Sequence, residues 1–267
     1  MRRASTPSAL ATEISRAARR RGAARALVLD LDGTLAPIAP RPADARVPAA
    51  VLDTLARLVR AGWRVAIVSG RPASGARRLV PVPGVVVFGS HGIERDGAPP
   101  TSKRFREAGR RAARLARAAR AAFGEFDGVL IERKPFGCAF HHRALDARTR
   151  QRFLRRLHAW LLVRDTRGLA LLDGRRVVEL RPAGVGKGVV ARRWPPARTA
   201  KPGDHSLVAI GDDVTDEELF TALSGRGLSV SVSRGRKATI AQRRLRGTAA
   251  VRRLLSRLAV ASDPRAA

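Results

Sequence analysis

Two carboxylates, Asp30 and Asp32, follow directly after the apolar run Ala26–Leu29. The run predicts a buried central strand with helices over both of its faces. Because side chains alternate along a strand, residues two apart lie on one side, and these carboxylates converge at the strand's carboxyl-terminal edge. Ligands usually bind at that edge of an open α/β sheet. Two adjacent carboxylates repel each other unless a cation lies between them or one holds a proton, so the spacing predicts metal binding or acid–base chemistry.

Acidic residues gather again in a short stretch from 212 to 218. In a chain with a net charge of +31, clustered acids mark places that require negative charge, and the simplest explanation is that they bind a divalent cation. Together the two stretches hold seven of the 22 acidic residues: Asp30, Asp32, Asp212, Asp213, Asp216, Glu217 and Glu218.

The positive charge itself is carried almost entirely by arginine. Only five of the 53 basic residues are lysine, and the arginines lie among abundant alanine, glycine and proline, which is typical of GC-rich codon usage. Aromatic residues make up 4% of the chain and tyrosine is absent, so side chains on which bases could stack are scarce. We therefore do not expect nucleic-acid binding as a role.

Composition sets further limits. A chain of 267 residues that is 45% apolar can form one large domain, or a core with a smaller domain. No apolar run is long enough to cross a bilayer, and the basic N-terminus lacks the apolar centre of a secretory signal. Cys138 is the only cysteine, which rules out an internal disulfide and a multi-cysteine zinc site. We expect a cytoplasmic monomer with no membrane partner.

A β-α-β unit surrounds the second candidate site. Apolar residues recur at helical spacing over 49–60, and 64–68 reads as the next strand, which the crossover makes parallel to the first. That strand ends in Ser69, and Pro72 suits the first turn of a following helix. Ser69 and the amides after it would then face an anion, although a serine at such a position alone is more often a helix N-cap.

Further strands at 85–88 and 205–210 extend the sheet. The fold class is therefore α/β, with a Rossmann-like parallel sheet, helices on both faces and an inserted smaller α/β domain. The insert reads as α-β-β-α-β-β, with helices near 104–123 and 147–163 and strands near 128–133, 137–143, 169–172 and 176–181. The expected segments are a basic N-terminal extension (1–24), a first core segment (25–99), the inserted domain (100–182), a second core segment (183–260) and a tail (261–267).

Asp-Leu-Asp-Gly-Thr-Leu at 30–35 resembles the first signature of the haloacid-dehalogenase-like phosphatases. The resemblance implies that Asp30 is the nucleophile that accepts the phosphoryl group and that Asp32 is the general acid and base, with Gly33 and Thr34 in support. It also implies that Mg²⁺ is required, with Asp30, Asp32 and Asp212 as its ligands.

Three later segments resemble the remaining signatures, in the same order. Ser69 matches the residue that binds phosphoryl oxygens, and Lys187 matches the lysine that neutralises the aspartyl phosphate. Asp212 and Asp213 match the acidic residues that hold Mg²⁺. Asp216 either supports this site or caps the helix expected over 217–223.

Five stretches resemble trehalose 6-phosphate phosphatase more narrowly: 30–40, 67–72, 89–94, 179–182 and 211–217. The resemblance implies a sugar-phosphate substrate. It also implies that the inserted domain over 100–182 is a cap domain that covers the site, excludes water and contacts the sugar. The candidate phosphate- and substrate-binding residues are Ser69, Gly70, Arg71, His91, Glu94, Lys134, His141, Arg143, Glu179 and Arg181.

The chain departs from that family's pattern at Arg133, His142 and Gly186, where an acidic residue, an aromatic and an Asp or Asn are usual. The first two departures lie in the cap, so the identity of the sugar stays open. The alternatives are a related phosphatase for sucrose, glucosylglycerol or mannosylglycerate phosphate, and a degenerate basic binding protein without turnover.

Overall fold

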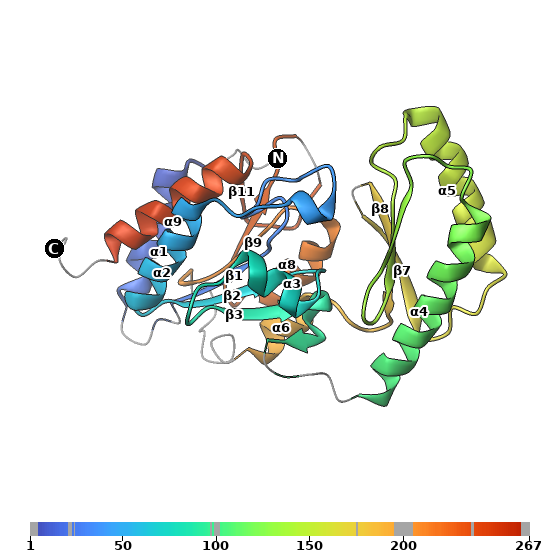
Figure 1. Cartoon of the computed structure of the whole chain (residues 1–267). Coiled ribbons are helices and arrows are strands. Elements are labelled where there is room, and N and C mark those ends of the chain that lie inside the picture. The colour runs from blue at the N-terminus through green and yellow to red at the C-terminus, as the bar shows by residue number, and fades with distance from the viewer. Residues whose placement is uncertain are drawn as a thin grey trace. The chain divides into compact units, whose positions relative to one another are not determined.

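The computed structural model describes residues 5–20, 23, 25–96, 98, 102–174, 176–194, 205–235 and 238–262. The chain forms two compact units (Figure 1). Unit 1 combines Met1–Ala98 with Gly186–Ala267, and unit 2 is Pro99–Val185. Within the described residues, no helix is both long and apolar enough to cross a membrane.

Unit 1 is built on a seven-stranded sheet with the order β11-β10-β9-β1-β2-β3-β4, in which only the β3–β4 pair is antiparallel. β1 lies between β2 and β9, as expected for a central strand, and all of its residues are buried. The strands are β1 (Ala26–Leu29), β2 (Arg64–Val68), β3 (Val86–Gly89), β4 (Glu94–Arg95), β9 (Leu207–Gly211), β10 (Leu228–Val232) and β11 (Arg243–Leu245).

Helices cover both faces of this sheet. Leu27 and Leu29 of β1 belong to a core shared with α1 (Pro7–Ala18), α2 (Ala49–Arg60), α3 (Ala73–Leu79) and α9 (Thr248–Ala261). Ala26 and Val28 belong to the opposite core, with α6 (Gly188–Arg193) and α8 (Val214–Leu223). The alternation along β1 therefore supplies both cores, and the α/β fold class is confirmed.

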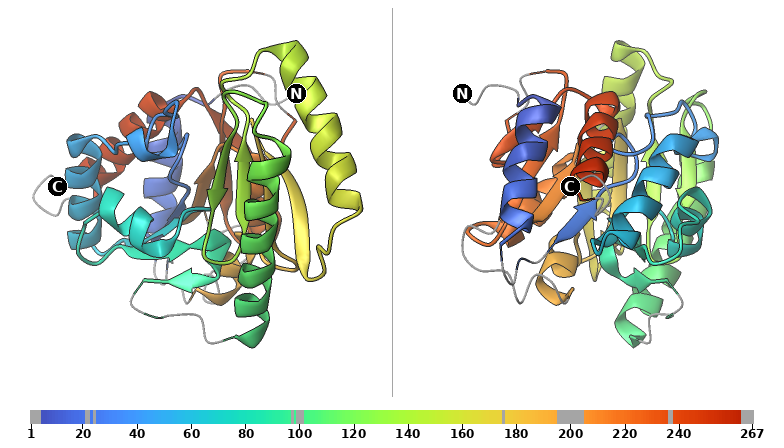
Figure 2. Two further views of the ribbon diagram at one scale, coloured as in Figure 1. Left: turned by 45° about the vertical axis from the view of Figure 1, so that its right-hand side comes forward. Right: turned by 90° about the vertical axis from the view of Figure 1, so that its left-hand side faces the viewer.

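Helix α1 near the N-terminus is part of the core of unit 1. The prediction that residues 1–24 form an extension outside the core is therefore wrong for this helix. Leu10 and Ile14 of α1 are buried against α9, which lies beside α1 (Figure 2). Thr6 caps α1 by accepting a hydrogen bond from Ala9 N at 3.2 Å. Alanines and polar residues between Leu10 and Ile14 and around them weaken the sequence pattern, but the packed face is apolar. Of the expected tail, residues 263–267 lie outside the described residues.

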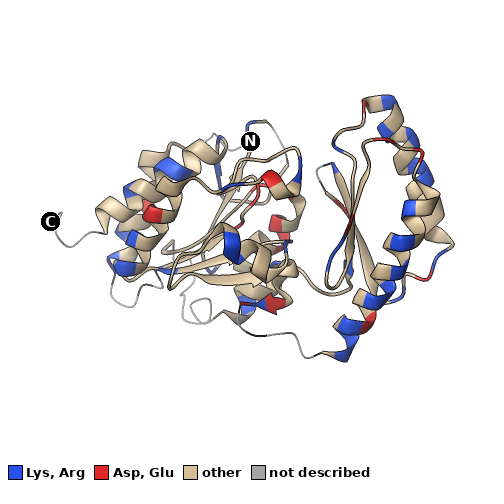
Figure 3. Ribbon diagram, viewed as in Figure 1, with Lys and Arg blue, Asp and Glu red and all other residues tan. Residues whose placement is uncertain are grey.

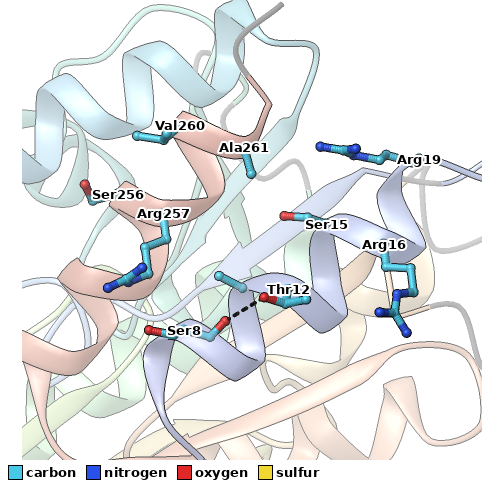
Figure 4. Close-up of a pocket in the computed structure, with 10 residues that line it drawn as sticks. Ser8, Thr12, Ser15, Arg16, Arg19, Ser256, Arg257, Val260 and Ala261 are labelled. Carbon is cyan, nitrogen blue, oxygen red and sulfur yellow. Dashed lines mark hydrogen bonds between the residues drawn. The ribbon is translucent and has the colours of Figure 1, made fainter. Parts of the chain in front are cut away.

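A groove with a volume of about 590 Å³ runs between α1 and α9 (Figure 4). Ser15, Arg19 and Arg257 are among the side chains that line it. It contains none of the residues that the sequence selects for chemistry, so we locate the candidate site at the carboxyl ends of the strands instead.

Unit 2 has an antiparallel sheet with the order β5-β6-β8-β7 and two helices on one of its faces. Phe140 and Leu180 of the sheet share a core with Ala116 of α4 and Phe153 of α5. Figure 3 shows Lys and Arg along both helices. The elements are α4 (Lys103–Ala122), β5 (Leu130–Arg133), β6 (Cys138–His141), α5 (Ala147–Leu162), β7 (Leu169–Gly174) and β8 (Val177–Pro182).

Candidate active site

Three carboxylates meet at the carboxyl ends of the two central strands. Asp30 follows β1, Asp212 follows β9, and Asp216 lies in the first turn of α8. Each offers one oxygen to a group in which all the oxygens lie within 4.8 Å of one another. The edge of the sheet that the sequence selects is therefore strongly acidic, although the strands themselves are apolar.

Lys187 lies between two of these carboxylates. Its Nζ donates to Asp30 Oδ1 at 2.5 Å and to Asp216 Oδ1 at 2.8 Å, and all three side chains are buried. Burial lowers the pKa of Lys187, but the carboxylates of Asp216 and Asp30 outweigh it, and the net shift is upward. The lysine is thus held in its charged form beside the candidate nucleophile.

The remaining charge favours a divalent cation. Burial raises the pKa of Asp30, and repulsion from Asp216 and Asp212 raises it further. The ammonium group of Lys187 lowers this pKa, but its effect is smaller than that of burial, and the net shift is upward. Burial and repulsion from Asp216 raise the pKa of Asp212 to about 7. Two buried carboxylates and the half-buried carboxylate of Asp212, with one ammonium group, leave an excess of negative charge and hard oxygen donors, which fits a divalent cation. The family signatures predict Asp32 in this set, and the structure groups Asp216 with Asp30 and Asp212 instead.

The side chain of Asp212 lies close to the backbone of Gly33, where a larger residue would not fit. A Cβ on Gly33 would lie 2.2 Å from Asp212 Oδ2, and the φ of Gly33 is +89°, in the left-handed region. The glycine of the first signature thus lets the β1 loop approach the carboxylate that follows β9. Thr34, the next residue, is fully buried.

Asp216 has both of the roles that the sequence left open, since it supports the candidate site and caps α8. Its Oδ1 accepts from Lys187, while its Oδ2 accepts from the backbone N of Asp212 at 2.9 Å and of Asp213 at 3.0 Å. Asp213 is the N-cap of α8, and the N3 side chain of Asp216 completes a capping box. One carboxylate therefore fixes the start of α8 and also contacts the lysine.

Asp32 makes a bidentate ion pair with Arg71. Arg71 Nε donates to Asp32 Oδ2 and Nη2 donates to Asp32 Oδ1, both at 2.7 Å. The pair joins the loop after β1 to the loop after β2, and its side chains are partly exposed.

The loop after β2 is held by a strained turn. Ser69 is buried, and its Oγ accepts from Arg71 N at 3.1 Å. The backbone N of Ser90 donates to Arg71 O at 2.7 Å, and that of His91 donates to Ser69 O at 2.9 Å. Ser90 and His91 have φ values of +49° and +58°, which L residues rarely adopt and which often mark functional sites.

His91 and Glu94 complete this arrangement. The buried His91 ring lies against Gly70, where a Cβ would be 2.8 Å from His91 Cε1. Glu94 Oε2 accepts from Ser90 Oγ at 2.5 Å and from Ala73 N at 3.2 Å. The structure therefore brings together the predicted residues from Ser69 to Glu94, and it places Glu94 in contact with the turn and with α3.

In unit 2, polar residues share the sheet face opposite the helices. Lys134 Nζ donates to Glu179 Oε1 at 2.7 Å, and both side chains are largely buried. His141 Nε2 and Glu132 Oε2 are 2.8 Å apart, and Arg181 is buried two residues beyond Glu179 on β8. Arg143, by contrast, is exposed in the turn after β6.

Glu132 was not among the residues selected from the sequence. It lies two positions before Lys134, so both side chains share one face of the sheet. That period of two was the signal that could have identified it.

Comparison with known proteins places the chain in a family. The sequence profile described as Trehalose-phosphatase matches residues 28–249. The chain belongs to the trehalose-phosphatase family. This confirms the resemblance drawn from the signatures, and the chain is a phosphatase.

Two relatives show the extent of the similarity. A probable trehalose-phosphate phosphatase of Sinorhizobium fredii is 33% identical over 243 residues, which are 88% of each chain. A trehalose-phosphate phosphatase of Mycobacterium marinum is 35% identical over 246 residues, which are 88% of this chain and 61% of that protein. The chain thus spans about three fifths of the mycobacterial relative.

Solved structures share the fold. The C-terminal domain of the C. albicans trehalose-6-phosphate phosphatase superposes with a TM-score of 0.75 at 21% identity, covering 96% of this chain and 97% of that one. A phosphatase of the haloalkanoate (HAD) superfamily from Bacteroides thetaiotaomicron gives a TM-score of 0.55 at 17% identity, covering 88% and 94%. At these identities the likeness concerns the fold alone.

Proposed function

We propose that the chain hydrolyses trehalose 6-phosphate to trehalose and phosphate through an aspartyl-phosphate intermediate, with Mg²⁺ as cofactor. The observation that carries this proposal is the buried contact between Asp30 and Lys187 at an acidic sheet edge, in a chain of the trehalose-phosphatase family. A carboxylate held beside an ammonium group in a buried site suits attack on a phosphoryl group.

In the first step an oxygen of Asp30 forms a bond to phosphorus as the bond between phosphorus and the sugar oxygen breaks. Lys187 and Ser69 stabilise the negative charge on the phosphoryl oxygens. Asp32, protonated at this point, gives its proton to the departing sugar oxygen. The products of the step are free trehalose and phosphorylated Asp30.

In the second step water attacks the phosphorus of the aspartyl phosphate. Asp32, now ionised, accepts a proton from that water, and the bond between phosphorus and Asp30 breaks. Phosphate leaves, Asp30 is again a carboxylate, and Asp32 is again protonated. The chain's own groups therefore return to their starting states.

Asp30, Asp212 and Asp216 are the residues that would hold Mg²⁺. When bound, the ion supplies charge neutralisation between the carboxylates and the phosphoryl oxygens. Asp216 enters this set in place of Asp32, because the carboxylate of Asp32 pairs with Arg71.

The polar sheet face of unit 2 is our candidate for sugar recognition. Glu132, Lys134, His141, Glu179 and Arg181 offer charged donors and acceptors that suit the hydroxyl groups of a disaccharide. The preference for trehalose over another sugar would depend on these side chains.

The deciding experiment measures phosphate release from trehalose 6-phosphate with Mg²⁺. Glucose 6-phosphate, sucrose 6-phosphate and glucosylglycerol phosphate serve as competing substrates, and the Asp30→Asn protein is the blank. We expect a strong preference for trehalose 6-phosphate. Preference for another sugar phosphate would keep the mechanism and reject the substrate, while no release from any of them would reject the enzyme activity itself.

A further inference from the structure

The ion pair between Arg71 and Asp32 occupies both oxygens of the proposed general acid. Arg71 Nε reaches Asp32 Oδ2 and Arg71 Nη2 reaches Asp32 Oδ1, each at 2.7 Å. In this geometry the guanidinium donates hydrogen bonds from Nε and Nη2, and it has no hydrogen-bond acceptor. While the pair persists, each oxygen of Asp32 has one of its two lone pairs engaged by Arg71, and that lone pair cannot carry a proton to a leaving group.

The same guanidinium is well suited to a phosphoryl group. Its planar fork matches phosphate oxygens as well as it matches a carboxylate. Arg71 follows Ser69 and Gly70 directly, and Arg71 N donates to Ser69 Oγ at 3.1 Å. Asp32 and an incoming phosphoryl group would therefore compete for one donor.

The Arg71–Asp32 pair is more accessible to water than the Lys187–Asp30 pair. The side chains of Arg71 and Asp32 are 21% and 38% exposed, whereas those of Lys187 and Asp30 are 4% and 7% exposed. Because water reaches both side chains of the Arg71–Asp32 pair, separating them costs less than separating the buried Lys187–Asp30 pair would. The backbone of Arg71 is fixed at both ends, because its N binds Ser69 and its O accepts from Ser90 N at 2.7 Å. Only the side chain has to move.

We propose that Arg71 exchanges partners during the reaction. Its guanidinium pairs with Asp32 in the free enzyme and binds the phosphoryl oxygens when substrate arrives, which releases Asp32 for proton transfer. The exchange rests on the proposed function. It makes Arg71 a positioning residue for Asp32 as well as a contact for phosphate.

The test is a double-mutant cycle on the binding of inorganic phosphate, measured by calorimetry on the full chain with Mg²⁺ present. Asp32→Ala removes the carboxylate that competes with phosphate for the guanidinium, so we expect phosphate to bind about tenfold more tightly, while Arg71→Ala weakens binding by about tenfold. In the Arg71→Ala background, Asp32→Ala should change the affinity by less than about twofold, because no guanidinium is left to release.

A matched control separates the exchange from simple loss of negative charge. Asp96 pairs with Arg77 Nε at 2.7 Å, and its side chain is 36% exposed, close to the 38% of Asp32. Asp96→Ala should leave phosphate affinity unchanged. Circular dichroism of every variant checks that the fold is kept, which the partial exposure of these pairs favours.

The outcomes are distinct. If Asp32→Ala raises phosphate affinity equally in the wild-type and Arg71→Ala backgrounds, the exchange is overturned, and charge repulsion by Asp32 alone explains the effect. No effect of Asp32→Ala in either background would also overturn it. Phosphate binding by neither the wild-type chain nor the Asp32→Ala variant would overturn the proposed function, and the exchange with it.

Discussion

The Nζ of Lys187 lies 2.5 Å from Oδ1 of Asp30, and both side chains are almost completely buried. The two residues come from the two separate chain segments of unit 1. Asp216 gives Lys187 a second carboxylate, so the charge of the lysine stays paired even when Asp30 is engaged elsewhere. A nucleophile can therefore leave this contact without stranding a buried ammonium group.

Asp30→Asn should abolish turnover and keep the fold. The amide has the shape of the carboxylate but cannot form the acyl phosphate, and Lys187 still has Asp216 as its partner. We expect kcat to fall by at least about a thousandfold, as for loss of other nucleophiles. Phosphate release and circular dichroism measure the two effects. Retained activity in a normally folded variant would reject Asp30 as the nucleophile.

Gly33→Ala should weaken divalent-cation binding through Asp212. The new Cβ would lie 2.2 Å from Asp212 Oδ2, so the carboxylate must move away from Asp30 and Asp216. Titration of Mg²⁺-dependent activity should show a half-saturating concentration raised by about tenfold or more.

Gly62→Ala is the matched control for this change. Its φ of +84° is close to the +89° of Gly33, but a Cβ at Gly62 has no atom within 4 Å. Both variants therefore carry the backbone strain of about 1–2 kcal/mol, and only Gly33→Ala displaces a carboxylate. Equal effects of the two variants on the Mg²⁺ titration would show that strain, not Asp212, is responsible.

Much of the core could be predicted from local pattern. The helix 49–60 and the strand 64–68 were predicted with the bounds that the structure has, because apolar spacing and Gly62 mark their limits. The signatures placed Asp30, Lys187 and Asp212 at one edge, and the structure brings them together. Short motifs at the ends of buried strands are readable because strand direction fixes where they lie.

Other features depend on contacts that no local pattern contains. β10 and β11 were not predicted as elements, and the segment that forms α9 shows only a weak helical pattern, since serine, glycine and arginine dilute the apolar positions. Leu254 and Leu258 of α9 nevertheless pack into the core. The ion pair of Asp32 with Arg71 joins residues 39 positions apart. The place of Asp216 in the acidic cluster likewise follows from how α8 packs, which the sequence left undecided.

Removal of divalent cations should make stability depend on pH through Asp212. Burial and repulsion from Asp216 raise its pKa from 3.8 to about 7, so the folded state binds the proton more tightly than the unfolded state does. Stability in EDTA should therefore fall as the pH rises from about 4 to about 7. Mg²⁺ should raise Tm more at pH 8 than at pH 5, because at pH 5 it competes with the proton.

Asp212→Asn tests the origin of this dependence. The variant should lose much of the fall in Tm between pH 5 and pH 8 in EDTA, and much of the rise on addition of Mg²⁺. Differential scanning calorimetry of both proteins gives these values. A variant with the same pH dependence as the wild type would assign it to another group.

His142→Phe should protect unit 2 against acid. Burial, with smaller contributions from Arg150 and Arg176, lowers the pKa of His142 from 6.5 to about 4, so the unfolded chain takes up a proton that the folded chain does not. Stability is therefore lost as the pH falls from about 6.5 to about 4. Phenylalanine cannot titrate, and it would occupy the place of the His142 ring near Phe153.

Hydrogen exchange of the amides over 138–161, at pH 5 and pH 7, measures this effect in unit 2 of the full chain. After correction for the intrinsic pH dependence of exchange, wild-type protection should fall at pH 5 more than protection in His142→Phe does. His158→Phe is the control, because His158 is exposed and its neighbour is Asp173. If His158→Phe protects as well as His142→Phe, or if neither does, the buried imidazole is not the acid-sensitive group of this unit.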